Sequence, residues 1–164
     1  MEGIEGAVSG DLIHMYFGYL FDEYGFRTQS ERHFESFGNW VYVFESASCR
    51  IRFFKDRFDV FVELGPLWSP PSWNVGPWIG LKVVLTLLVP DADFPWPSAM
   101  SPDREQLEGM AKIFRPYCRQ ACELFGENSY PLNQERLEKI RDRQDDEFYG
   151  RYGLLDDEAD GSGK

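Results

Sequence analysis

Cysteine and histidine are the residues of this sequence whose types could support metal or redox chemistry, but their spacing predicts no metal centre. Cys118 and Cys122 are four residues apart, so on a helix they share one face. Two thiolates at that spacing hold a metal only where further ligands converge on them. His14 and His33 are the only histidines, and both lie far away in the sequence. We therefore expect no metal site.

The motifs of nucleophilic and phosphate chemistry are also missing from the sequence. Neither histidine stands in a nucleophile motif, and no Gly-rich loop ends in Gly-Lys-Ser/Thr. Paired acids such as Asp22–Glu23 and Asp91–Asp93 could assist hydrolysis only if two carboxylates converged in one cleft. In a chain with 28 acidic residues they are better explained as solvated charge. We predict a protein that is not an enzyme and uses no cofactor.

Two loops rich in aromatic residues are the strongest candidates for binding. Segment 65–78 combines four prolines with three tryptophans, and proline excludes regular structure there. A loop this aromatic either folds over a sheet, which we favour, or forms a contact surface. Segment 90–100 places acidic residues next to aromatic ones. The predicted partner-binding residues are Trp68, Trp73, Asp91, Asp93, Phe94 and Trp96.

The charge balance limits the classes of partner. The formal net charge is -11 and the pI is near 4.6. Such a surface repels phosphate backbones and anionic membranes, so neither nucleic acid nor a membrane is an expected partner, whereas a basic protein is. No apolar run approaches the roughly 20 residues of a membrane span. Three cysteines and the lack of a signal peptide indicate a reducing compartment, so we expect a cytoplasmic protein.

Segment 39–64 should form the framework that positions these loops. Three runs of β-branched and aromatic residues are separated there by short polar breaks, which is typical of an antiparallel meander. Segment 26–34 is mostly polar and is expected to add a first strand at the edge of the sheet. A three-residue loop at 46–48 and a two-residue turn at 56–57 define a register. The predicted pairs are Val43 with Ile51, Ile51 with Val62, and Phe53 with Val60.

This register gives the meander two different faces. The aliphatic face should lie against helices and comprises Val41, Val43, Cys49, Ile51, Phe53, Val60, Val62 and Leu64. On the other face, Arg50 pairs with Glu63, and Arg52 lies between two aromatic rings. If that face is concave, it could form a small-molecule site together with the Trp/Pro loop. The residues of this alternative site are Tyr42, Arg50, Arg52, Phe54, Phe61 and Glu63.

Helices are predicted before and after the meander in the sequence. Asp11 caps a helix that begins at Leu12 and stops at Gly25. Segment 79–89 is apolar almost throughout, so its period does not separate strand from helix. Its β-branched residues favour a strand, while its Leu/Val spacing and its position after a proline loop favour a helix, which we choose.

Two more helices follow. One begins at Ser101–Pro102, is kinked by Pro116 and stops at Gly126. The last begins near Pro131 and has few apolar positions, so it should lie on the surface. Residues 154–164 are acidic and Gly-rich and are expected to be a disordered tail.

The meander also resembles a known group of sequences. The residues that carry the resemblance are GF at 25–26, FGNWVYVFES at 37–46 and CRIRFFKDRFDVFVEL at 49–64. They are similar to small uncharacterised bacterial proteins, some of which are thought to be immunity-type proteins of toxin systems. The resemblance implies no catalytic residue.

Together these observations predict a single α+β domain over residues 1–153. It consists of an N-terminal helix, a four-stranded antiparallel meander, and C-terminal helices packed on one face. The predicted function is non-enzymatic protein binding, in the form of an immunity-type inhibitor of a basic partner. The alternative is a small-molecule binding domain that uses the aromatic sheet face.

Overall fold

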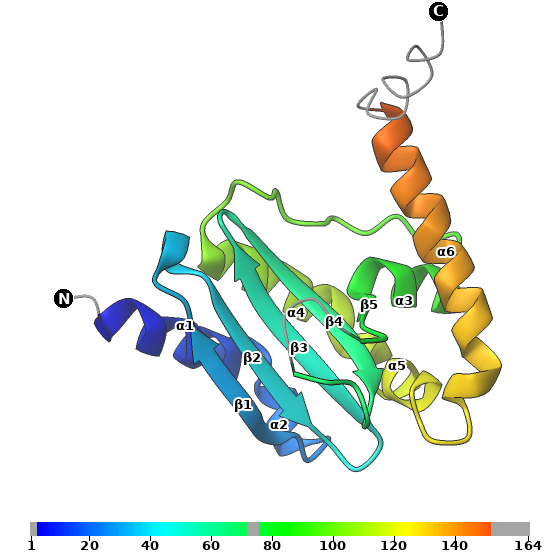
Figure 1. The fold of residues 1–164 in the computed structure, drawn as a ribbon, viewed down its shortest axis with the longest axis horizontal. Coiled ribbons are helices and arrows are strands. Elements are labelled where there is room, and N and C mark those ends of the chain that lie inside the picture. Colours follow the sequence, from blue (N-terminus) through cyan, green and yellow to red (C-terminus); the bar gives the residue numbers. More distant parts are fainter. Residues whose placement is uncertain (1–2, 72–75, 152–164) are drawn as a thin grey trace, which may run out of the picture.

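A five-stranded antiparallel sheet forms the centre of the protein (Figure 1). The structure is a computed structural model and describes residues 3–71 and 76–151. Each strand pairs with its neighbour in the sequence, so the sheet order is β1-β2-β3-β4-β5. The strands are β1 (Arg27–His33), β2 (Trp40–Glu45), β3 (Cys49–Asp56), β4 (Asp59–Pro66) and β5 (Ile79–Gly80). The predicted α+β class is confirmed, with the short β5 as a strand beyond the expected four.

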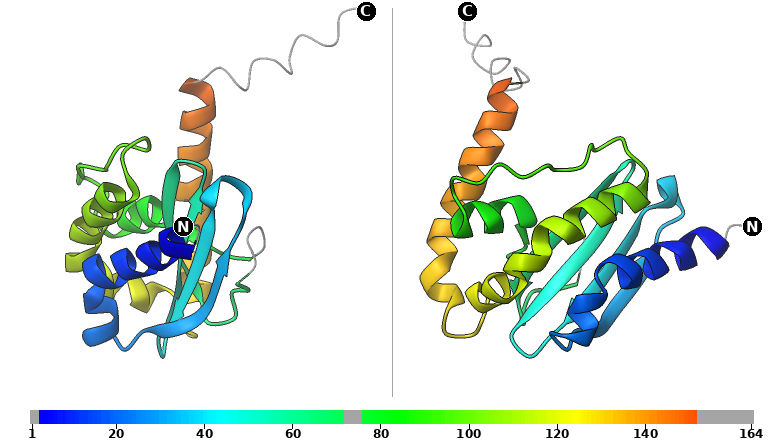
Figure 2. Two further views of the ribbon diagram at one scale, coloured as in Figure 1. Left: turned by 90° about the vertical axis from the view of Figure 1, so that its left-hand side faces the viewer. Right: turned by 180° about the vertical axis from the view of Figure 1, so that it is seen from behind.

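Helices cover one face of this sheet (Figure 2). The α-helices are α1 (Gly3–Tyr16), α2 (Gly18–Asp22), α3 (Leu81–Leu88), α4 (Asp103–Phe114), α5 (Cys118–Leu124) and α6 (Tyr130–Arg151), and the 3-10 helices are η1 (Ser36–Gly38) and η2 (Arg115–Tyr117). Phe17, Phe53 and Phe114 are fully buried between the helices and the sheet. The long helix α6 packs beside α3, at the β5 edge of the sheet.

The first strand lies at the opposite edge, as the polar segment 26–34 predicted. Six of the seven residues of β1 are exposed. A register irregularity between Thr28 and Ser30 interrupts its pairing with β2. Such irregularities are common at sheet edges, where they hinder pairing with another chain.

The predicted register of the first hairpin is wrong by one residue. Ile51 lies opposite Phe44, not Val43. The connection is one residue longer than expected, because Glu45 pairs with Arg50. The Ser46 N–H donates to the Cys49 carbonyl at 2.9 Å, and the Ser46 Oγ accepts from the Cys49 N–H at 3.2 Å. The serine side chain thus satisfies the polar groups of the wider loop.

This one-residue shift exchanges the two faces of β2, because side chains alternate along a strand. Tyr42 and Phe44 point toward the helices and are buried there. The Phe44 ring meets Phe21 edge-on, with 5.0 Å between the ring centroids. Val41 and Val43 instead form a small second cluster with Trp78, on the face opposite the described helices.

The second hairpin differs from the prediction by two residues. Its turn is Arg57–Phe58, because Asp56 pairs with Asp59. Arg57 has a φ of 61°, and its N–H donates to the Asn39 Oδ1 at 2.8 Å. Phe53 therefore lies opposite Val62, not Val60. A shift of two leaves every side chain on its predicted face.

The N-terminal helix begins earlier than predicted. Helix α1 starts at Gly3, so Asp11 lies inside it and is not its cap. The helical segment is broken at Phe17 and continues as α2. Gly25, with a φ of 68°, follows α2 in the left-handed conformation that glycine favours, which confirms the predicted stop.

Segment 79–89 contains both a strand and a helix. Ile79 and Gly80 pair with Leu64 and Glu63 as β5, and Leu81–Leu88 form helix α3. The chosen helix is therefore confirmed for most of the segment. Gly80 has extended backbone angles and is the N-cap of α3.

The C-terminal helices follow the prediction closely. Helix α4 begins at Asp103, one residue after Pro102, and Pro116 lies in the 3-10 turn η2 that separates α4 from α5. Helix α6 buries Leu137 fully and leaves Phe148 exposed. No helix in the described ranges is long and apolar enough to cross a membrane. The predicted disordered tail at 154–164 lies outside the described residues.

Candidate functional site

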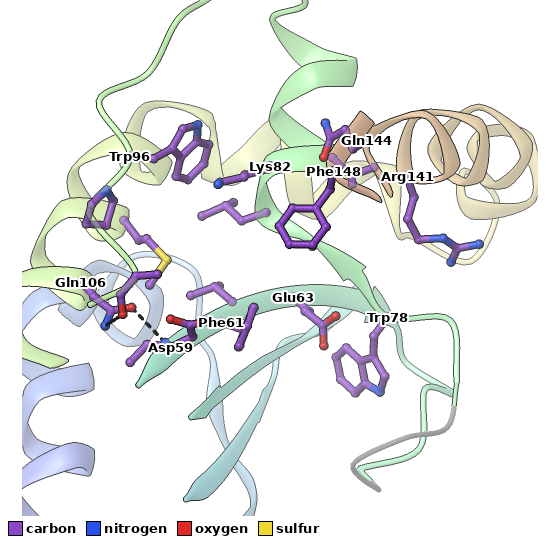
Figure 3. Close-up of a pocket in the computed structure, with 18 of the residues that line it drawn as sticks. Asp59, Phe61, Glu63, Trp78, Lys82, Trp96, Gln106, Arg141, Gln144 and Phe148 are labelled. Atoms are coloured by element: carbon purple, nitrogen blue, oxygen red, sulfur yellow. Dashed lines mark hydrogen bonds between the residues drawn. The ribbon is translucent and has the colours of Figure 1, made fainter. Parts of the chain in front are cut away.

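A cavity of about 540 Å³ opens along the outer edge of β4 (Figure 3). Strand β4 forms one side, and α3 and α6 form the opposite side, from which Phe148 points toward β4. The 96–99 segment and α4 close one end. The lining residues are Asp59, Val60, Phe61, Val62, Glu63, Trp78, Gly80, Leu81, Lys82, Val83, Trp96, Pro97, Ala99, Gln106, Met110, Arg141, Gln144, Asp145 and Phe148.

The cavity exists because β5 is too short to cover β4. The pairing between them stops at Glu63 and Gly80, and α3 then turns away from the sheet. Gly80 lines the cavity, and a Cβ atom built on it would meet nothing within 4 Å. Residues Asp59 to Val62 therefore have a helix wall and open space beside them in place of a neighbouring strand.

Gln106 connects the β3–β4 turn to the loop before α4. This side chain is only 3% exposed. Its Oε1 accepts from the Val60 N–H at 2.9 Å. Its Nε2 donates to the carbonyls of Phe58 at 2.8 Å, Ser101 at 2.8 Å and Ala99 at 3.1 Å. One glutamine thus fixes two walls of the cavity relative to each other.

Aromatic and charged side chains surround the opening. The Lys82 Nζ lies 5.4 Å from the ring centroid of Trp96, within range of a cation–π contact. Gln144 donates to the Thr86 hydroxyl at 3.0 Å and so ties α6 to α3. Phe61 is 40% exposed and Phe148 is 55% exposed, so both rings are accessible to a ligand.

A second, smaller cavity of about 130 Å³ adjoins the first. Lys82, Trp96 and Gln144 line both cavities. Phe94 lines only the small one, and its ring lies 6.0 Å from that of Trp96. Residues of α3 line both cavities, and we call the two cavities together the groove.

The predicted partner-binding residues are divided by the fold. Phe94 and Trp96 lie together in the groove, while Asp91 and Asp93 are exposed on the loop before them. Trp68 does not line either cavity, is 66% exposed and packs edge-on against Tyr130 at 6.1 Å. Trp73 lies outside the described residues.

The residues of the alternative small-molecule site are also divided. Phe61 and Glu63 line the large cavity. Tyr42 lies on the helix-covered face, with its hydroxyl 3.2 Å from His33, because the register of the first hairpin differs from the predicted one. The predicted pairing of Arg50 with Glu63 is wrong. Arg50 lies 3.6 Å from Glu45 and donates to the Ser69 carbonyl at 2.6 Å.

Arg52 is the partner of Glu63, and both are held by the protein itself. The Arg52 Nε and Nη2 donate to one carboxylate oxygen of Glu63, the former at 3.0 Å. The guanidinium lies 4.6 Å from the Trp78 ring and 5.1 Å from the Phe54 ring. Trp78 covers Arg52, which is 5% exposed. Of the predicted folding of the Trp/Pro loop over the sheet, the structure therefore confirms the part at Trp78, whereas Trp68 is exposed. Arg52 is inaccessible to a ligand.

Several lining residues were not predicted from the sequence. Lys82, Arg141 and Gln144 belong to helices whose neighbours could not be inferred from a pattern. Phe148 did carry a signal, because it is a large apolar residue on a helix with few apolar positions. No sequence signal identified Gly80, because it lines the cavity only as a result of β5 ending at that residue.

The three cysteines are buried and are not part of the cavity lining. A hydrogen bond with the Cys122 thiol and burial raise the pKa of Cys49 above its usual range. The pKa of Cys122 is raised by its contact with Cys118 and by burial. Thiols in such surroundings are weak nucleophiles. Within residues 3–71 and 76–151, no group of three His, Cys, Asp or Glu residues could hold a metal ion.

Comparison with protein-family models, curated proteins and solved structures finds no match to this chain. The functional argument therefore depends on the geometry of the groove and on the charge of the chain.

Proposed function

We propose that this protein is a non-enzymatic binding module that recognises another protein through the β4–α3–α6 cavity. The observation that carries the proposal is the cavity of about 540 Å³ with exposed aromatic rings at its opening. Its volume falls within the roughly 300–1,000 Å³ of small-molecule pockets, so it is large enough to receive side chains of a partner. Aromatic residues around a pocket are the side chains that most often contribute the binding energy of protein interfaces.

The net charge of -11 supports a basic partner. Long-range attraction between an acidic protein and a basic one accelerates their association. This is the behaviour expected of an immunity-type inhibitor that masks a basic toxin. Some of the small bacterial proteins that the meander resembles are thought to be of that type. Inhibition here means that the partner's own site is covered, with no reaction in the cavity.

A small molecule is the second candidate, because the same cavity is large enough for one. The alternative residue set narrows to Phe61 and Glu63, which line the cavity. Lys82 and Arg141 could provide counter-charges for an anionic group there. This candidate differs from the first in needing no long-range electrostatic attraction.

The test uses the proteins encoded beside this chain in its genome, produced one at a time and titrated calorimetrically. We expect one basic neighbour to bind at micromolar concentration or tighter. Gly80→Trp should weaken that complex at least tenfold, because the indole would occupy the cavity. Trp68→Ala is the matched control, since Trp68 is exposed away from the cavity.

Three results would distinguish the candidates. A complex that Gly80→Trp does not weaken would exclude the cavity as the binding site. A complex lost only in Trp68→Ala would move the site to the loop 65–71. No complex with any neighbour, combined with a small molecule whose binding is blocked by Gly80→Trp, would favour the second candidate.

A further inference from the structure

Strand β4 presents backbone groups to the cavity that a neighbouring strand would normally bind. In a two-residue antiparallel hairpin the closing pair, Asp56 and Asp59, faces inward, and the direction of the backbone groups then alternates. The backbone groups of Val60, Val62 and Leu64 consequently face away from β3. The hydrogen bond from the Val60 N–H to Gln106 agrees with this assignment.

Part of this edge is already bound within the protein. Leu64 pairs with Ile79 of β5, and Gln106 accepts from the Val60 N–H. The Val60 carbonyl and the Val62 N–H have no strand opposite them among the described residues, because β5 ends at Gly80. One acceptor and one donor, two residues apart, thus point toward the cavity. An extended peptide satisfies such a pair with its own backbone.

The side chains along the edge indicate which peptide would fit. Asp59, Phe61 and Glu63 lie on one face of β4, and Val60 and Val62 lie on the other. A strand added beside β4 would place alternate side chains on these two faces. Basic residues would meet Asp59 on the first face, where opposite charges attract across neighbouring strands.

The second face leads to the apolar part of the cavity. Leu81, Met110 and Pro97 line the cavity together with Val60 and Val62. Apolar side chains of the peptide would be buried against them. The aromatic ring of Phe148 lies across from β4 and would cover the outer side of the added strand.

We propose that the cavity binds an extended segment of the partner as an additional strand along β4, with basic and apolar residues in alternation. The ladder would continue the one that β5 begins. This inference rests on the proposed function, because it concerns how a protein partner is recognised. It adds a backbone-dependent mode of binding that a pocket for a single side chain would not require.

The test begins with a displayed library of random 12-residue peptides, selected on the full chain and depleted on the Gly80→Trp variant. The probe is the most enriched peptide, made synthetically. We expect apolar residues at alternate positions and lysine or arginine between them. Each peptide bond is then N-methylated in turn, which removes one backbone donor at a time and leaves the protein unchanged.

Strand addition predicts a two-residue period in this scan. N-methylation at the position whose N–H donates to the Val60 carbonyl should weaken binding at least tenfold. Methyl groups two residues to either side would also point at β4 and crowd it, whereas the positions between should tolerate the change. Val62→Pro should weaken binding similarly, because it removes the Val62 N–H that the peptide would bind. That N–H faces away from β3, so the pairing of β4 with β3 does not need it. If Val62→Pro does not fold, the scan on the unchanged protein still decides.

Failure of the inference is distinguishable from failure of the proposed function. A peptide that Gly80→Trp blocks but that shows no alternating N-methyl pattern would overturn strand addition and leave the cavity as a protein-binding site. The absence of any enriched peptide would also overturn it, while a folded neighbour that binds the cavity would still support the proposed function.

Discussion

Replacing Gln106 by leucine should destabilise the closed end of the cavity. The glutamine is almost fully buried and makes four hydrogen bonds to backbone groups. Leucine has a similar volume and can make none of them. The substitution therefore removes the connection between the β3–β4 turn and the loop before α4 without leaving a large void.

The magnitude follows from which groups lose their partner. Val60 is 6% exposed, so its N–H would be left buried and unpaired, at a cost of about 1–3 kcal/mol. Phe58 and Ala99 are exposed, so water can replace the donor to their carbonyls. We expect Gln106→Leu to lower the unfolding free energy by about 2 kcal/mol. For a chain of this size, that corresponds to a fall in Tm of about 4–8 °C.

A matched variant separates the donor and acceptor roles of the amide. Gln106→Glu keeps an acceptor for the Val60 N–H but turns an oxygen toward three carbonyls. Those carbonyls and burial should hold the pKa of the introduced carboxyl above its usual range. A group with a raised folded-state pKa contributes stability when protonated and loses it as the pH rises. The loss of unfolding free energy in Gln106→Glu, relative to the original protein, should therefore shrink as the pH falls toward about 4.

Urea denaturation at pH 7 and pH 4, followed by tryptophan fluorescence, measures both effects. The affinity of the selected peptide for each folded variant tests whether the cavity walls have moved. We expect Gln106→Leu and Gln106→Glu both to bind it more weakly. An unfolding free energy for Gln106→Leu within about 0.5 kcal/mol of the original protein would refute the reasoning, because that is the range of changes at uninvolved surface sites.

Four further predictions concern the rest of the fold. Gly65→Ala should lower the unfolding free energy by about 1–3 kcal/mol in urea, because the added methyl would collide with the buried Ser69 side chain; a neutral result would show that the covering loop moves freely. Arg52→Leu should cost about 3 kcal/mol in the same assay, since it leaves the half-buried Glu63 carboxylate without its partner, and a stability gain would contradict this. The unfolding free energy should fall as the pH rises above 9, because the raised pKa of Cys49 makes the folded state keep a proton that the unfolded state releases. In the native protein the three thiols should resist Ellman's reagent at pH 8, and rapid labelling before unfolding would refute their burial.

Local patterns predicted the elements well where the chain carries explicit signals. The sequence predicts a kink at Pro116, and the structure has a 3-10 turn there that separates α4 from α5. Gly25 follows the end of α2, as the sequence predicts. The edge position of β1 follows from its polar residues alone. These signals depend on the backbone of a few adjacent residues, so no distant contact is needed to interpret them.

The strand register could not be predicted in the same way, because it depends on the lengths of the loops, and the sequence is compatible with more than one loop length. The first connection is one residue longer than predicted, and the Ser46 side chain accepts a hydrogen bond within it. The longer connection places Tyr42 on the helix side of the sheet. The second turn moved by a residue as well, but left the faces unchanged. Because the predicted register of the first hairpin is wrong by one residue, the sequence predicts Tyr42 on the opposite face of the sheet.

The aromatic composition of segments 65–78 and 90–100 by itself determined that large rings must either be covered or be available for contact. Only the tertiary structure decided which is which: Trp78 is almost fully buried over Arg52, while Trp96 remains partly exposed beside the cavity. The cavity depends on β5 ending after two residues and on α6 standing beside α3. Both are contacts between segments far apart in the chain, and a sequence pattern reports only on neighbours. The open edge of β4, and with it the candidate site, is therefore a property of the assembled fold.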